Sequence, residues 1–123
     1  MVKIQSIEIK REIDEYADLS FLTDHLGGEE YAEQDDQRVA AYGDWWMLGI
    51  MARAEVSYAI GQGNSRLESL TSGGLWGIES DSGAEYIETV AREELADLKA
   101  HLGHFSVDLS NFDELAELAI SKI

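Results

Sequence analysis

Carboxylates are the most abundant chemically active side chains in this sequence, and they are unevenly placed. The chain has 25 Asp and Glu residues against nine Lys and Arg, a formal net charge of −16 at pH 7. One base, Arg38, stands among the acids Glu12, Asp14, Glu15, Asp18, Asp24, Glu29, Glu30, Glu33, Asp35, Asp36 and Asp44. Acidity that serves solubility or salt adaptation should spread over the whole surface. Both remain alternative explanations of the total charge, but the clustering favours a specific contact.

The residues that we predict to bind a partner lie in and beside this acidic run: Asp24, Glu29, Glu30, Glu33, Asp35, Asp36, Asp44 and Trp45. Clustered negative charge repels nucleic acids and anionic membranes and attracts basic protein surfaces. A tryptophan beside it is a typical hot-spot residue of protein interfaces. Residues 24–44 have no sustained periodicity after Gly27-Gly28, which predicts a loop or a short acidic helix inserted into the domain.

The histidines offer the best spacing for a metal site, yet we predict none. His101 and His104 are three residues apart, and Asp97 precedes His101 by four. A stable site needs a third protein ligand with support around it, and Gly103 is expected to end the helix before His104. The chain has no cysteine, which excludes disulfides and thiolate ligands. We therefore predict no catalytic set, no metal and no cofactor.

The glycine-rich stretch at residues 72–83, SGGLWGIESDSG, is the second candidate site. A glycine-rich run before a helix can bind an anion, and Glu79 and Asp81 could serve a small enzyme or ligand-binding domain. The stretch lacks the GK[ST] ending of a phosphate-binding P-loop. The structural alternative is that its glycines turn the backbone and let Trp76 enter the core.

Two strand patterns predict the sheet that must position these residues. Residues 2–11 alternate in hydrophobicity, with a change of phase that predicts a bulge near Gln5-Ser6. Residues 45–60 predict a long central strand with one face buried along its length and the other, at Met47, Gly49 and Met51, apolar over half. Turn residues at 61–64 precede a returning strand at 66–71, and residues 75–78 predict a further short strand.

Two helices complete the expected fold. Residues 82–102 repeat apolar positions at helical spacing, and Ser82 with Glu85 predicts a capping box at the start. A second start signal at residues 110–113 predicts a terminal helix that buries Leu115, Leu118 and Ala119. The whole chain, residues 1–123, therefore predicts one acidic α+β domain: an antiparallel sheet of about three to five strands, with the long helix (about 82–102) on one face and a short C-terminal helix. With no export signal or apolar span, we expect a cytoplasmic protein.

The segment SGGLWGIESDSGAEYIETVAREELADLKAHL, with DEYADLSFL upstream, resembles a group of short uncharacterised proteins encoded by phages and mobile elements. The resemblance covers about half of the chain and implies origin more than activity. Such elements encode anti-CRISPR and anti-restriction inhibitors. By that analogy we expect a non-enzymatic inhibitor whose acidic surface mimics nucleic acid and occupies the basic channel of a host defence protein, without touching nucleic acid or membrane. The alternatives are an enzyme or ligand-binding domain at the glycine-rich stretch, and a structural or regulatory homodimer formed through the Met47, Gly49 and Met51 face.

Overall fold

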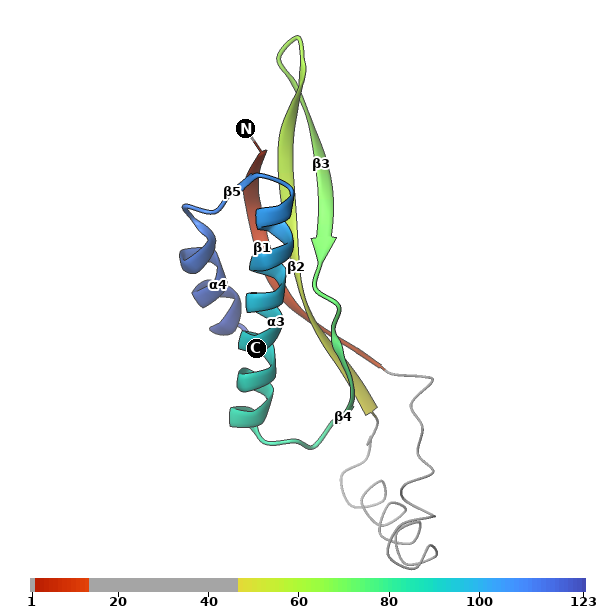
Figure 1. Ribbon diagram of the computed structural model, residues 1–123. Helices are drawn as coiled ribbons and strands as arrows, with labels where there is room; N and C mark the ends of the chain where they lie inside the picture. Colours follow the sequence, from red (N-terminus) through yellow and green to blue (C-terminus); the bar gives the residue numbers. More distant parts are fainter. Residues whose placement is uncertain (1, 14–46) are drawn as a thin grey trace, which may run out of the picture.

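The computed structural model describes residues 2–13 and 47–123, which form one five-stranded sheet with two helices on one face (Figure 1). The elements are β1 (Val2–Ile13), β2 (Met47–Gly61), β3 (Asn64–Thr71), β4 (Leu75–Glu79), α3 (Ala84–His104), β5 (Val107–Asp108) and α4 (Phe112–Ile120). The strand order is β3-β2-β1-β5, and β4 also pairs with β2. The predicted α+β class is confirmed. Because β5 runs parallel to β1, the sheet is mixed rather than purely antiparallel.

The long strand predicted around residues 45–60 is β2, the centre of the sheet. Ile50, Ala52 and Ala54 on its inner face are fully buried, as alternation in a half-buried strand requires. Burial does not continue along the whole strand, because Ile60 is 57% exposed. The end of β2 and the start of β3 extend beyond α3 as a two-stranded arm (Figure 1).

The predicted change of phase in β1 is confirmed. The register with β2 shifts between Ile4 and Ser6, which is where the apolar alternation changes parity. One extra residue at this bulge puts both Ile4 and Ile7 in the core, where they are 4% and 9% exposed.

Strands β3 and β4 lie one after the other along the same edge of β2. β3 pairs with residues 53–61 and β4 with residues 47–50. A second irregularity in β4 contains Gly77 at φ +78°. Trp76 does not enter the core, contrary to expectation: it is 45% exposed and its ring covers Gly49 on the sheet face away from the helices.

Helix α3 buries the predicted face, with Ile87, Val90, Ala91, Leu95, Leu98 and Leu102 inward. Its predicted ends are wrong. The N-cap is Gly83, with no side-chain cap, so Ser82 and Glu85 form no capping box. Gly103 lies inside the helix, which continues to His104; the left-handed residue that follows is Ser106, at φ +56°.

Helix α4 confirms the predicted terminal helix and the inward positions of Leu115 and Ala119, but not that of Leu118. Phe112, Ala116, Ala119 and Ile120 are buried, whereas Leu118 is 52% exposed. Once Phe112 enters the core, helical spacing places Leu118 on the outer side. Asn111 donates from Nδ2 to the carbonyl of Ile4 at 3.1 Å instead of capping the helix. Both helices pack on the same core, α3 mainly over β2 and α4 over β1.

Candidate functional site

The predicted partner-binding residues Asp24, Glu29, Glu30, Glu33, Asp35, Asp36, Asp44 and Trp45 lie outside the described residues. The structure does place the points where this segment leaves and rejoins the sheet. β1 ends at Ile13, β2 begins at Met47, and Ile13 is paired with Leu48. Residues 14–46 carry ten of the 25 acids and one of the nine bases. The strand ends that flank this segment meet at one end of the sheet, opposite the β2–β3 turn (Figure 1).

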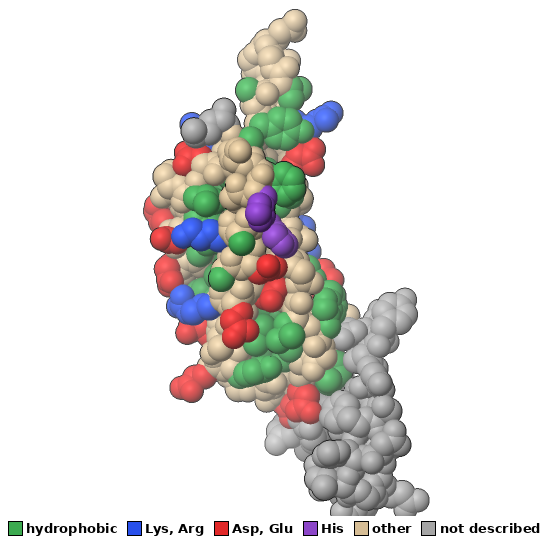
Figure 2. All heavy atoms as spheres, viewed as in Figure 1, with side chains coloured by type: hydrophobic (Ala, Val, Ile, Leu, Met, Phe, Trp, Pro, Cys, Tyr) green, Lys and Arg blue, Asp and Glu red, His purple; other side chains and the backbone are tan. Residues whose placement is uncertain are grey.

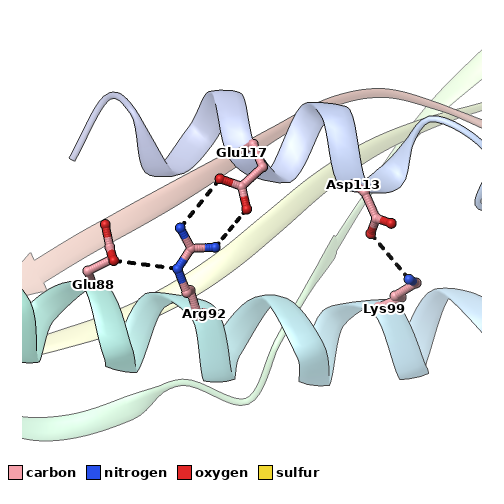
Figure 3. A network of polar contacts seen from close by, with 5 residues as sticks. All are labelled: Glu88, Arg92, Lys99, Asp113 and Glu117. Carbon is pink, nitrogen blue, oxygen red and sulfur yellow. Dashed lines mark hydrogen bonds and ion pairs between the residues drawn. The ribbon is translucent and has the colours of Figure 1, made fainter.

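Many acids in the described part are held by contacts within the chain. Arg92 of α3 reaches Glu117 of α4 with Nη1 2.7 Å from Oε1, and its Nε lies 3.5 Å from Glu88 (Figure 3). The hydrogen bond from Arg92 is the main cause that lowers the pKa of Glu117, and the same bond raises the pKa of Arg92. One guanidinium thus forms ion pairs with two carboxylates and joins the two helices.

A second cation, Lys99, joins the two helices further along α3. Lys99 Nζ lies 3.2 Å from Asp113 Oδ1 and 5.4 Å from the centre of the Phe112 ring, within cation–π range. Figure 3 shows both bridges spanning from α3 to α4. The crevice between them, of about 250 Å³, is lined by the bridging residues themselves, so its charged groups already have partners.

The glycine-rich stretch is held by two acids of α3. The backbone N–H of Gly73 donates to Asp97 Oδ2 at 3.0 Å, and that of Gly74 donates to Glu94 Oε1 at 2.7 Å. Ser72 Oγ also donates to Glu94, at 2.7 Å. The donors of Ser72, Gly73 and Gly74 are therefore used by the chain's own carboxylates, and this turn attaches the sheet edge to α3.

The histidines lie at the end of α3. His101 Nε2 is 3.6 Å from Asp97 Oδ1, one helical turn away. His104 is in the helix but exposed. Across residues 2–13 and 47–123, no group of three or more His, Asp or Glu side chains is arranged to hold a metal ion.

The open face of the sheet is polar in the half where the sequence predicts it to be. Arg53 Nε lies 2.9 Å from Glu8 Oε1, and its Nη2 lies 3.7 Å from Glu55. The apolar half of this face is largely covered: Met47 is 6% exposed and the Trp76 ring lies on Gly49. These residues do not form the open apolar surface on which the homodimer alternative depended.

Three exposed acids in the described part, Glu85, Glu93 and Glu114, have neither an ion pair nor a side-chain hydrogen bond with another described residue. They come from different positions on α3 and α4. Figure 2 shows acidic side chains scattered over the helical face, with bases among them, rather than gathered in one patch. The described part thus has no concentrated acidic patch on this face.

Sequence reasoning missed an exposed surface at the arm. Phe105 after α3 is 62% exposed. Leu67 of β3 is equally exposed, but it lies on the opposite face of the sheet, because it pairs with Ser57 of β2. A groove of about 290 Å³ lies at the base of the arm, lined by apolar residues that include Tyr58, Leu70 and Phe105. The returning strand was predicted, but alternation does not reveal that α3 ends before it covers the arm.

No protein-family model, curated protein or solved structure matches the chain. Among the described residues, no helix is long and apolar enough to cross a membrane.

Proposed function

We propose that the protein is a non-enzymatic inhibitor, of the kind carried by phages and mobile elements, that binds a basic nucleic-acid-binding protein of its host in the host cytoplasm. A CRISPR or restriction complex is the expected class of target. Carboxylates of residues 14–46 stand in for phosphates in the basic channel, and Trp45 supplies an apolar anchor.

The observation that carries this proposal is the division of charge between two parts of the chain. In the described part, Arg92, Lys99 and Arg53 each hold one or more carboxylates. Residues 14–46 have Arg38 as their one base against ten acids. Ile13 and Leu48, which flank this segment, are paired. The segment with the unbalanced charge is therefore attached to the sheet at a single place.

A mimic of nucleic acid should be captured by its target at low salt and should displace the target's own ligand. The test is to capture tagged protein with its partner from host extract at low ionic strength, then release the partner by raising the salt. Binding of a labelled DNA or RNA oligonucleotide to the purified partner is then measured with and without the protein. We expect competition, and an affinity that falls steeply with salt.

Two matched variants distinguish binding through the carboxylates of residues 14–46 from attraction by the net charge of the whole molecule. The first carries Glu29→Gln, Glu30→Gln and Glu33→Gln; the control carries the same change at Glu85, Glu93 and Glu114, which have no ion pair in the described part. We expect the first set to weaken binding sharply and to flatten its salt dependence, while the control has a small effect. Equal loss in both variants would contradict the segment as the contact, and a partner without a basic surface would contradict the proposal itself.

A further inference from the structure

Strand β3 forms an outer edge of the sheet. All of its residues are exposed except Leu70, which is half-buried, and no described strand pairs with its outer side. Residues 65–71 pair with β2 without irregularity and contain neither proline nor lysine. Natural sheets usually protect such an edge with a bulge, a proline or a lysine, because it is a template for another strand.

The hydrogen bonds at the end of β3 determine which of its groups face outward. The N–H of Ser72 donates to the carbonyl of Ala52 at 2.8 Å. Hydrogen-bonded pairs alternate along an antiparallel ladder, so Leu70, Glu68 and Arg66 also bond to β2. The backbone N–H and C=O groups of Ser65, Leu67, Ser69 and Thr71 therefore point away from β2, toward the open edge.

We propose that β3 is a self-pairing edge, through which two copies of this chain join their sheets about a two-fold axis at Leu67. In this register Leu67 faces Leu67 of the second copy, Ser65 faces Ser69, and the outward backbone groups meet one another. An axis at Arg66 or Glu68 would place like charges face to face. Of the two-fold registers along the strand, the one centred on Leu67 sets Arg66 opposite Glu68, and symmetry makes that pair twice.

The charged residues of β3 would gain ion-pair partners in this dimer that they do not have among the described residues of the single chain. Arg66 has no ion pair with any described residue, although the chain carries 25 acids. Glu68 accepts a hydrogen bond from the Tyr58 hydroxyl at 3.1 Å, at an exposed position. In the proposed pairing, Arg66 and Glu68 occupy non-hydrogen-bonded positions, where facing Cα atoms are about 4.5 Å apart and side chains are closest. Strand β3 itself contributes no net charge.

The antiparallel arrangement also limits repulsion between two strongly acidic molecules. Leu67 pairs with Ser57 of β2, and Met47 lies further along β2 by about 33 Å at ~3.3 Å per residue. A two-fold axis at Leu67 sends the two ends that carry residues 14–46 in opposite directions, on the order of 60 Å apart. The Debye length at physiological salt is about 8 Å, so the strand ends to which the two acidic segments are attached lie several Debye lengths apart. The inference does not depend on the proposed inhibitory function.

The first test is charge reversal on the full chain, read as dimer dissociation by analytical ultracentrifugation. We expect wild type to dimerise as concentration rises, and Arg66→Glu to raise the dimer Kd about tenfold or more, because two attractive pairs become repulsive. The double change Arg66→Glu with Glu68→Arg should restore dimerisation. Lys122→Glu, which makes the same change in net charge at the exposed chain end, should have little effect. A monomer at all concentrations, a loss no greater than that of Lys122→Glu, or no recovery in the double variant would overturn the proposal.

The second test fixes the register. Because the chain has no cysteine, a single introduced thiol can react only with its copy. Leu67→Cys should give a covalent dimer with a short bis-maleimide, since the facing Cα atoms lie about 5.5 Å apart. Thr71→Cys, also exposed on β3, should not, because the two thiols would be about 27 Å apart. Equal cross-linking at both positions, or none at Leu67→Cys, would overturn the register.

Discussion

Ser72 joins three parts of the chain where the edge of the sheet breaks between β3 and β4. Its hydroxyl accepts from the N–H of Ala52 at 2.9 Å and donates to Glu94 at 2.7 Å, and the side chain is buried, with 5% exposed. An antiparallel ladder would normally satisfy that N–H with a backbone carbonyl. The Ser72 hydroxyl replaces the carbonyl, which lets the chain turn away at Gly73-Gly74 without leaving a buried donor unpaired.

Ser72→Ala should therefore destabilise the protein more than removal of an ordinary surface hydroxyl. The substitution leaves the Ala52 N–H unsatisfied inside the sheet, which costs about 1–3 kcal/mol of unfolding free energy. Urea denaturation measures the change, with Ser69→Ala, exposed on β3, as the control. Similar unfolding free energies for the two variants would mean that water replaces the lost hydroxyl.

At the scale of elements, α3 and α4 are joined by exposed ion pairs whose strength depends on pH. The hydrogen bond from Arg92 lowers the pKa of Glu117 below its ordinary value of 4.5. A carboxylate with a lowered folded-state pKa stabilises the fold above its unfolded pKa, and that contribution is lost as the pH falls through the folded value. The contribution of this pair is thus complete at neutral pH, begins to decline near pH 4.5 and is lost as the pH falls through the lower folded-state pKa.

Glu117→Gln should consequently lower the urea midpoint at pH 7 by a small amount, and the difference from wild type should vanish toward pH 3. The effect is small because both side chains are exposed to solvent. The control is Glu114→Gln on the same helix, whose carboxylate has no described ion-pair partner. A difference that persists unchanged at pH 3 would show that Glu117 acts through something other than its charge.

Helices and strands whose hydrophobic pattern is set by burial could be predicted from the sequence. The ends of these elements, which depend on individual side-chain contacts, could not. Alternation identified β2 and the β1 bulge, because only one parity can face the core. The start of α3 was missed because Ser82 matches a capping pattern, whereas Gly83 takes the N-cap position. Trp76 was misplaced because hydrophobicity does not tell whether a large ring enters a core or covers a neighbouring glycine, as it does at Gly49.

The candidate site was predictable only in part. Charge counting identifies the acidic run from Glu12 to Asp44, and the pairing of Ile13 with Leu48 adds where this run joins the sheet. The groove at the base of the arm could not be predicted from β3 alone, because it depends on where α3 ends, far along the chain. The role of Glu94 and Asp97 as acceptors for the glycine turn is likewise a contact between distant segments.

At the scale of the whole molecule, a net charge of −16 opposes compaction. Added salt should therefore raise stability, and replacement of Glu29, Glu30, Glu33, Asp35 and Asp36 by their amides should remove part of that gain. At low salt we expect the unfolding free energy of the five-amide variant to lie within about 0.5 kcal/mol of the wild-type value, or slightly above it, since surface substitutions rarely cost more. The comparison is made by thermal unfolding of both proteins at about 20 mM and about 500 mM salt. A marked loss of stability in the variant would mean that these acids take part in folding contacts.

The pairing of Ile13 with Leu48 has a consequence for how this fold can change. The strands on either side of residues 14–46 are paired with each other, so the sheet holds the two flanking residues together whatever sequence connects them. Closure entropy grows only slowly with loop length, by about 0.6 kcal/mol for each doubling. The domain can therefore accept segments of different length and chemistry at this position with little change in stability. Mutation and selection can therefore change residues 14–46 while β1, β2 and the two helices stay the same.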